Sequence, residues 1–537
     1  MRHRYTLLLP LGLFAAALAG ALCYALLPKA VAIANYSSVG RVPRIRPDYT
    51  DAVIPPNIAP LNFQVEEEGA QYCVKVHGDQ GQAFQVAGGT PGIQMPLRRW
   101  SDLLAANRGA RVYFDVYVKA TDGSWRRFDT LSASVAVEPI DRYMVYRRIN
   151  VLYNVFATIS IRQRDLESFD DSLVIDNRSF DGGCINCHTF LDNRSDKVII
   201  HMRSGRVDYG AGMLLLENGD VRKIDARTQF APRPAAFISW HPSGRLVAFS
   251  INKLRQPFHS ARMEVRDAVD LDSALGIYNF DSKTVTSPPS ISAPDRLETF
   301  PAWSADGRYL YFCSAPILWA DRNATPPPHF DQVRYSLMRI AYDVEKNSWG
   351  NLETVLSGEK LGKSITQPRP SPDGRFLVFC MSDYSLFATF QPSADLYIMD
   401  LTTGSYERMD CNSEWSESWH SWSSNSRWLA FSSKRGDGLF AKAYISYIDK
   451  DGKAHKPLVL PQKNPAFYDS WIMLYQMPEL TRDPFPIVGE KLAHAIRSGP
   501  WERSSLPVTS ATPGAQRQQR AGPPEATSTP EPWSAHE

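Results

Sequence analysis

The sequence predicts an all-β protein, a β-propeller preceded by a small β-sandwich-like domain. The first observation is composition, since 13 Trp, 23 Tyr, 32 Gly and 39 Pro suit many short strands joined by tight turns. The second is the alternation of apolar and polar residues at 112–118, which is typical of a half-buried strand. The third is a repeat that begins near residue 195, and repeated four-stranded units are typical of propeller blades.

Size and charge limit the classes of function. The 537 residues are enough for more than one buried core, so two or three modules are expected. The 59 basic and 57 acidic residues are interspersed and leave a net charge of +2. Because no region carries a strong field of one sign, nucleic acid is not expected as a partner.

The N-terminus has the pattern of an export signal. Arg2 and Arg4 precede an apolar run at residues 5–27, and the small residues of Ala32-Ile33-Ala34 follow it. The run is long enough to span a bilayer, so residues 1–34 are either a cleaved signal peptide or a retained N-terminal membrane anchor. Positive charges ahead of the run favour translocation of the remainder. We expect an exported protein of the periplasm or cell envelope, either free or anchored to the inner membrane by residues 5–27.

Two regions follow this signal segment. Residues 35–58 include the Pro-rich stretch Ile54-Pro55-Pro56-Asn57 and are expected to be a linker. Residues 59–141 are predicted to form the β-sandwich-like domain, interrupted by a short helix near residues 99–106.

The repeats predict four-stranded units. Each copy has a polar turn, an arginine and an apolar strand with Phe at its last or next-to-last position, as expected for a hairpin. A second strand pair follows each copy. The gapless copies occupy residues 240–250, 303–313, 370–380 and 422–432, and the second pairs occupy 275–285, 337–349, 396–409 and 443–458.

The turn Ser371-Pro372-Asp373-Gly374-Arg375 resembles the TolB-type propeller repeat, and the resemblance extends over residues 195–480. A fifth blade aligns from residues 196–224. The resemblance implies six blades, the sixth combining the lead-in to the repeats with residues 468–477. Long insertions after the second strands are either a docking face or variable surface loops. The tail at residues 500–537 is rich in Pro, Ala, Ser, Thr, Gln and Glu and is expected to be disordered.

Residues Cys184-Ile185-Asn186-Cys187-His188 form the C-x-x-C-H signature of c-type haem attachment. Two thiols at this spacing can bond the two haem vinyl groups as thioethers, and the histidine can ligate the iron. Gly182 and Gly183 would ease close approach of the backbone to the macrocycle. We expect one covalent haem c held by Cys184, Cys187 and His188, within a haem-binding lead-in and first blade edge at residues 142–204.

Three roles without haem are also open to the cysteine pair. A zinc site needs two further ligands, and no second Cys pair or His pair lies near in the sequence. A thioredoxin-like redox pair needs a βαβ setting, which the neighbouring sequence does not show. A disulfide between Cys184 and Cys187 would be short and strained. The export signal favours haem, since attachment of this kind takes place outside the cytoplasm.

The sixth iron ligand has two leading candidates. His201 stands where the other aligned blades place a core phenylalanine, and a buried imidazole there needs a polar partner, which haem iron would be. Met202 is also an acceptable axial ligand. Neighbouring strand residues point to opposite faces, so at most one of the two reaches the iron. Met213 and His241 are weaker candidates, and an open or water-bound iron beside a core histidine is the alternative.

Beyond the repeat, the segments at 54–63 and 164–169 together with the haem motif resemble a family of exported TolB-like proteins that carry one haem motif. This resemblance covers most of residues 50–480 and implies architecture more firmly than activity. TolB itself lacks haem, so a role in the Tol envelope system does not transfer.

Three functions are compatible with the sequence. The first is an exported monohaem c-type cytochrome that transfers electrons to or from a redox partner protein. The second is a non-enzymatic envelope scaffold or haem-based sensor that uses the propeller as a binding module. The third is a haem enzyme with an open distal site, so the sequence favours an electron carrier or binding protein over an enzyme without deciding between them.

Overall fold

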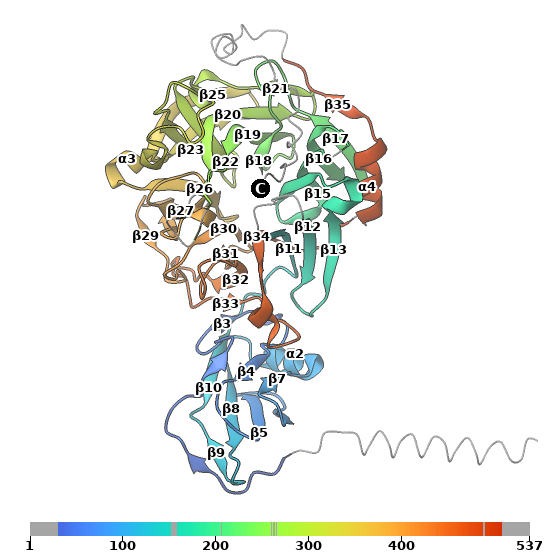
Figure 1. Ribbon diagram of the computed structural model, residues 1–537, viewed down its shortest axis with the longest axis vertical. Helices are drawn as coiled ribbons and strands as arrows, with labels where there is room; N and C mark the ends of the chain where they lie inside the picture. The colour runs from blue at the N-terminus through green and yellow to red at the C-terminus, as the bar shows by residue number, and fades with distance from the viewer. Residues whose placement is uncertain are drawn as a thin grey trace, which may run out of the picture.

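The computed structural model describes residues 31–506 apart from 152–157, 206, 259, 261–263, 265 and 487–488. Six β-sheets are arranged around a common axis, and a separate N-terminal domain lies beside one side of this ring (Figure 1). The innermost strands of successive sheets contact one another around the complete ring. The predicted all-β propeller with six blades is therefore confirmed.

The blades are numbered in chain order from the strand that begins at Cys184. Blade 1 has β14 (Cys184–Leu191), β15 (Arg194–Arg203), β16 (Ala211–Glu217), β17 (Asp220–Asp225) and β35 (Trp501–Arg503); blade 2 has β18 (Ala236–Trp240), β19 (Leu246–Arg255), β20 (Val269–Asn279) and β21 (Thr284–Thr286); blade 3 has β22 (Arg296–Trp303), β23 (Tyr309–Pro316), β24 (Ser336–Asp343) and β25 (Ser348–Leu356). Blade 4 has β26 (Ser364–Pro370), β27 (Phe376–Ser382), β28 (Asp395–Asp400) and β29 (Tyr406–Arg408); blade 5 has β30 (Glu417–Trp422), β31 (Trp428–Ser433), β32 (Lys442–Tyr447) and β33 (Leu458–Val459); blade 6 has β34 (Met473–Thr481), β11 (Tyr143–Asn150), β12 (Ile159–Asp165) and β13 (Asp171–Asp176).

Blade 6 closes the ring with strands from both ends of the propeller. The late strand β34 is innermost and pairs antiparallel with β11, and β12 and β13 complete the sheet. The lead-in to the repeats therefore supplies three strands and the C-terminal segment supplies one, as the sequence predicted for the sixth blade. This arrangement joins distant parts of the chain by backbone hydrogen bonds.

The hairpin turn of each aligned repeat has a local chemical cause. Gly244, Gly307 and Gly374 take positive φ values of 67°, 72° and 72°, and Ser426 takes 60° at the same place in blade 5. Glycine adopts this backbone region without steric cost, which explains the repeated Gly-Arg pair. A serine before the turn closes it, as where Ser371 Oγ accepts a 2.9 Å hydrogen bond from the backbone N–H of the second strand.

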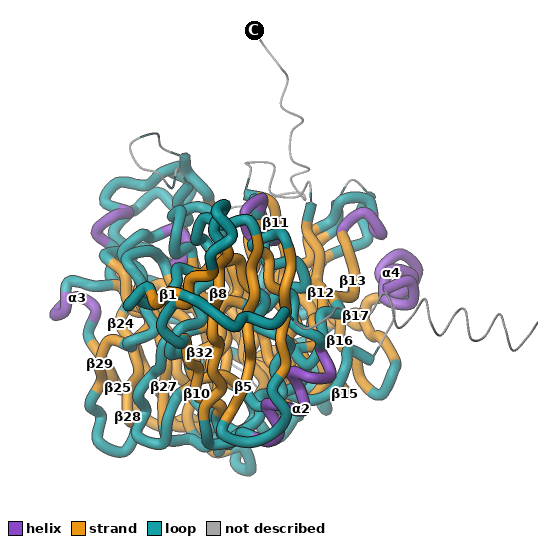
Figure 2. The backbone as a smooth tube through the Cα atoms, turned by 90° about the horizontal axis from the view of Figure 1, so that it is seen from below, coloured by secondary structure: helices purple, strands orange, loops and turns teal. Residues whose placement is uncertain are grey.

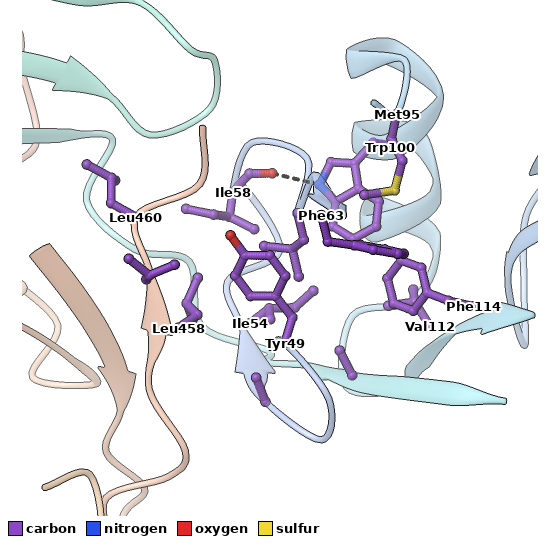
Figure 3. Close-up of a cluster of buried hydrophobic side chains, with 14 of the residues drawn as sticks. Tyr49, Ile54, Ile58, Phe63, Met95, Trp100, Val112, Phe114, Leu458 and Leu460 are labelled. Carbon is purple, nitrogen blue, oxygen red and sulfur yellow. Dashed lines mark hydrogen bonds between the residues drawn. The ribbon is translucent and has the colours of Figure 1, made fainter. Parts of the chain in front are cut away.

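The N-terminal domain has two sheets and a helix. Its larger sheet contains β1 (Ser37–Ser38), β3 (Val53–Ile54), β5 (Gln71–Gly78), β6 (Phe84–Gly88), β8 (Arg111–Lys119), β9 (Trp125–Arg127) and β10 (Leu131–Val135); the smaller contains β2 (Ile45–Arg46), β4 (Phe63–Val65) and β7 (Gly92–Ile93); the helix is α2 (Leu97–Ala106). Trp100 of α2 packs in this core, and its indole N–H donates a 2.9 Å hydrogen bond to the Ile58 carbonyl (Figure 3). Leu458 and Leu460 of blade 5 join the same apolar cluster, so the domain is packed against the propeller.

Residues 35–58 correct one sequence expectation. They are not a linker, because β1, β2 and β3 belong to the sheets of the N-terminal domain. Ile54 and Ile58 are buried in the core of that domain. Proline-rich sequence was a poor guide here, since the flanking apolar side chains bury enough surface to order the segment.

The remaining helices lie at the periphery (Figure 2). The short α3 (Gly358–Leu361) precedes blade 4, and α4 (Gly489–Ser498) packs on β13 and β17, at the outer edges of blades 6 and 1. Strand β35 then extends blade 1, so residues 501–503, expected within a disordered tail, are ordered. The predicted signal segment up to residue 30 and residues 507–537 lie outside the described residues. None of the described helices is both long and apolar enough to cross a membrane.

Candidate functional site

All six inner strands carry a β-bulge at the same height along the axis. Two residues of each inner strand oppose a single residue of the second strand, and a bulge of this kind redirects side chains. The two-residue bulges are at 186–187, 237–238, 300–301, 367–368, 419–420 and 477–478. Five first bulge residues have positive φ, between 47° and 56°: Phe237, Phe300, Gln367, Trp419 and Met477. Large side chains rarely adopt this conformation, and such residues concentrate at functional sites.

The bulges surround a cavity on the propeller axis. The cavity has a volume of about 30 Å³, and Cys187 and His188 line it together with bulge residues of the five other blades. Cys187 also belongs to an apolar cluster with Phe237, Phe300 and Met477. The second half of the C-x-x-C-H sequence therefore faces the centre of the molecule.

The two motif cysteines are free thiols in different surroundings. Cys184 is 5% exposed and packs in the apolar cluster between blades 6 and 1, while Cys187 is 3% exposed and lies at the central cavity. Burial raises the pKa of the Cys187 thiol. Arg203 Nη2 donates a weak 3.7 Å hydrogen bond to Cys184 Sγ. Gly183, just before the motif, has no room for a side chain, because a Cβ would stand 2.6 Å from the Arg203 carbonyl oxygen.

His188 has one engaged and one unpaired ring nitrogen. The side chain is 1% exposed, and Nε2 donates to the Val145 carbonyl oxygen at 3.3 Å. Nδ1 is buried and makes no hydrogen bond of normal geometry, and the Met477 backbone is the other polar group that acts on the ring. Burial lowers the pKa of this imidazole to about 4, so the ring is neutral at physiological pH. A neutral imidazole whose second nitrogen is held by a backbone carbonyl is the usual form of a metal-ligating histidine.

A buried arginine stands beside the motif. Arg147 in β11 is 7% exposed, and its Nη2 donates to the side-chain oxygen of Gln476. Its positive charge acts on both motif thiols and contributes to lowering the pKa values of His188 and His201. The residues predicted to hold haem therefore share one buried cation.

The structure places His201 as the repeat alignment requires. His201 is opposite the bulge of blade 1, as Phe249, Phe312, Phe379 and Phe431 are opposite the bulges of blades 2 to 5. The imidazole is 3% exposed, its Nδ1 lies in hydrogen-bond contact with the Ala235 carbonyl oxygen, and burial lowers its pKa to about 3. His201 does not line the central cavity. Its role as the sixth ligand stays a prediction.

The other sequence candidates have different environments. Met202 is fully buried in the same apolar cluster as Cys184. Met213 pairs with His201 across β15 and β16 and packs in a separate cluster between blades 1 and 2. His241 has both ring nitrogens engaged, with Ser243 Oγ at 2.8 Å and the Gly307 carbonyl oxygen at 3.1 Å. His241 is thus a structural residue of the turn after β18.

Sequence reasoning missed several residues that line the cavity together with His188. Met477 and His420 line it from blades 6 and 5. His420 donates from Nε2 to the Val378 carbonyl oxygen at 3.0 Å and its Nδ1 lies 3.8 Å from Cys380 Sγ, so the Met477 thioether is the less encumbered donor. Glu479 also lines the cavity, with Oε1 3.7 Å from Arg369 Nη2, and burial raises its pKa to about 7. No local sequence signal marks these positions, because the bulges of the inner strands have no fixed residue type.

A chelated ion and a covalent haem require different arrangements of the motif residues. Across the described ranges, no three His, Cys, Asp or Glu side chains gather closely enough to hold a metal ion. In c-type attachment the two sulfurs bond porphyrin carbons and only the histidine ligates iron, so the three groups need not converge on one point. His188 has an unpaired ring nitrogen and both thiols are free, but only Cys187 and His188 line the central cavity.

No family model and no curated protein matches the chain. Among solved structures, the β-propeller domain of the Trilobed protease from Pyrococcus furiosus is 11% identical, with 66% of this chain and 95% of that chain covered and a TM-score of 0.32. A prolyl endopeptidase is 12% identical and the Dos1 propeller is 12% identical, with TM-scores of 0.31 and 0.27. The match to the prolyl endopeptidase covers 66% of this chain and 42% of that chain. The match to the Dos1 propeller covers 45% of this chain and 66% of that chain. These neighbours are β-propeller proteins, and no activity is carried over from them.

Proposed function

We propose that this protein is an exported monohaem c-type cytochrome that exchanges electrons with a protein partner. The observation that carries the proposal is the C-x-x-C-H sequence on the inner strand of blade 1, with two free buried thiols and an unpaired nitrogen on His188. Membrane export by residues 1–34 fits the proposal, because haem attachment of this kind follows translocation. The location of the mature protein would then be the periplasm or the outer side of the inner membrane.

The residues of the motif have separate tasks in this proposal. Cys184 and Cys187 would hold the haem through thioether bonds to its two vinyl groups, formed by addition of each S–H without an oxidant. His188 offers its unpaired nitrogen to the iron while the Val145 carbonyl fixes the ring orientation. The apolar bulge residues Phe237 and Phe300 exclude water from the site. Bound haem would supply a one-electron couple.

The surface for a redox partner would be the propeller face where second strands lead to third strands. Loops after equivalent strands emerge at the same end of a propeller, which makes this face continuous across blades. Three of these loops expose large apolar side chains: Val207 is 45% exposed, Phe258 50% and Leu318 38%. Exposed apolar groups gathered on one face suit a transient protein contact.

A haem-based sensor or open-site enzyme is the second candidate, and one observation favours it. Arg369 and Glu479 form an ion pair at the cavity, and a polar pair beside His188 would suit a small polar ligand. Electron transfer needs a filled sixth position, whereas ligand binding needs an open one.

The deciding experiment is an optical spectrum of protein produced in a host competent in cytochrome c maturation, together with a denaturing gel stained for haem. A haem-stained band and sharp reduced α and β bands that carbon monoxide leaves unchanged are the results expected for electron transfer. Carbon monoxide binding would favour the sensor or enzyme, and absence of covalent haem would refute both.

A further inference from the structure

The central cavity is lined by buried side chains that leave hydrogen-bond donors unused. Gln367 and Trp419 line it from blades 4 and 5 and are 5% and 6% exposed. Gln367 Nε2 and the Trp419 indole Nε1 are buried and have no hydrogen-bond partner in the described part of the chain. Buried polar groups are nearly always paired, so each exception requires an explanation. Two unpaired donors at one cavity indicate that a ligand occupies it.

Both unused groups can only donate hydrogen bonds. The orientation of the Gln367 amide is fixed, because its Oε1 accepts a 2.7 Å hydrogen bond from the Trp419 backbone N–H. Nε2 therefore presents N–H groups, and an indole nitrogen has no acceptor capacity. Gln367 and Trp419 are the first residues of their bulges, with φ values of 56° and 51°, so the bulge backbone holds both donors at the propeller axis. A matching ligand must present acceptor oxygens, which a metal cation does not have.

A cationic side chain stands beside these donors. Arg369 of blade 4 lines the same cavity, and its side chain is 32% exposed. Its Nη2 lies 3.7 Å from Glu479 Oε1, a distance too long for a hydrogen bond. The guanidinium therefore keeps N–H donors for a second carboxylate, whose geometry and charge it matches.

The size of the cavity limits this ligand to a few atoms. The cavity volume is about 30 Å³, and one water molecule needs about 10–15 Å³. This leaves room for about three non-hydrogen atoms, the number in formate, which is the smallest carboxylate. The apolar rings of Phe237 and Phe300 form part of the wall and offer nothing to a larger polar molecule.

We propose that the central cavity binds a small carboxylate anion of the size of formate. Arg369 pairs with its negative charge, and the Gln367 amide and the Trp419 indole donate hydrogen bonds to its oxygens. These residues belong to blades 4 and 5 and require no haem, so the site goes beyond the proposed function and does not rest on it.

The test is thermal unfolding of the full-length protein in sodium formate, with sodium chloride at equal ionic strength as the reference. Formate should raise the melting temperature of the parent above the chloride reference in a saturable manner, because it binds the folded protein alone. Arg369→Gln should raise the half-saturating concentration by about tenfold or more, since it removes the charged partner. Arg339→Gln is the matched control, because Arg339 is 35% exposed and pairs with Glu353 away from the cavity. It should leave the half-saturating concentration unchanged.

Trp419→Phe is the second variant, which keeps an aromatic ring at the bulge and removes the N–H donor. The half-saturating concentration of formate should rise by about tenfold in this variant as well. An unchanged concentration in both Arg369→Gln and Trp419→Phe would overturn the proposal, because formate would then act elsewhere on the protein.

Two further results would also overturn it. No effect of formate beyond that of chloride would show that the cavity holds water only. Formamide has the same number of non-hydrogen atoms without the charge, so a saturable effect equal to that of formate would show that the site does not select an anion. The measurements use protein produced with and without the cytochrome c maturation machinery. A parent protein that lacks haem but responds to formate would refute the proposed function and support this inference.

Discussion

Replacing His201 by phenylalanine tests two hypotheses: that His201 is a buried neutral side chain of the blade core, and that it is the sixth ligand of a haem iron. Four sister blades place a phenylalanine at this position, and all four are at most 1% exposed. The space opposite the bulge therefore accepts a phenyl ring in this fold. The substitution His201→Phe removes the contact between the imidazole and the Ala235 carbonyl oxygen, a loss of about 1 kcal/mol, and adds apolar burial of similar size. At pH 7 the stabilities of the haem-free proteins should therefore differ by no more than about 1–2 kcal/mol.

The pH dependence gives a sharper magnitude. Burial lowers the pKa of His201 from 6.5 to about 3 in the folded protein. As the pH falls below 6.5, His201 becomes protonated in the unfolded chain but stays neutral in the folded protein. The free energy of unfolding of the parent protein therefore decreases. At pH 5 this loss amounts to about 2 kcal/mol, from 1.5 units at 1.36 kcal/mol each. The His201→Phe variant has no imidazole at this position, so this loss of stability does not occur in it. The contributions of His188 and His420 cancel in the comparison, because both proteins contain these residues.

The assay is urea unfolding of haem-free parent and variant at pH 7 and pH 5, followed by tryptophan fluorescence. The stability of His201→Phe relative to the parent should improve by about 2 kcal/mol between the two pH values. The exposed His494 of α4 provides the control. The stability of His494→Gln relative to the parent should be nearly the same at pH 7 and pH 5. Equal pH dependence in parent and His201→Phe would refute the view that His201 is a buried neutral imidazole.

The haem-loaded form of the same variant tests ligation. If His201 is the sixth ligand, His201→Phe should lose the six-coordinate spectrum and bind carbon monoxide while remaining haem-stained. An unchanged spectrum would exclude His201 and leave a methionine or an open position.

The other predictions concern attachment, the remaining donor and a buried ion pair. Cys184→Ala and Cys187→Ala should each keep a haem-stained band through one thioether, and the double variant should lose it on a denaturing gel. Met477→Ala should leave the six-coordinate spectrum unchanged if His201 is the ligand, and new carbon monoxide binding would assign Met477 instead. Glu264→Gln should destabilise the fold by about 3–5 kcal/mol in chemical unfolding, because it leaves Lys434 buried without a counter-charge. A loss below about 1 kcal/mol would show that this pair is solvated.

The propeller could be predicted because its signals are local. The turn residues, the alternating strands and the constant spacing within each repeat all lie within short windows, and the structure forms hairpins at those places. The alignment of His201 with the four phenylalanines is confirmed by strand register, since all five oppose a bulge. The sixth blade could be predicted as well. Five blades were visible as repeats, which left one blade to be formed by the segments that precede and follow the repeats.

Other features could not be found from local pattern. Residues 35–58 resemble a linker in composition, yet their isolated apolar side chains fit a core built by strands that come later in the chain. The bulges are also invisible in the sequence, because they have no fixed residue type: Phe, Gln, Trp and Met all occupy the positive-φ position. They are set by the crowding of six strands around one axis.

The surroundings of the haem motif are a product of that same closure. Val145 and Arg147 reach the motif because β11 pairs with β34, which stands next to β14 in the ring, so residues far apart in the chain become neighbours of His188. A C-x-x-C-H sequence on a loop could bind haem in many folds, whereas here the carbonyl that orients its histidine and the cation beside its thiols both belong to blade 6. Haem attached to blade 1 would therefore interact with the blade that joins the two ends of the propeller. Under the proposed function, attachment would stabilise ring closure as well as provide a redox centre.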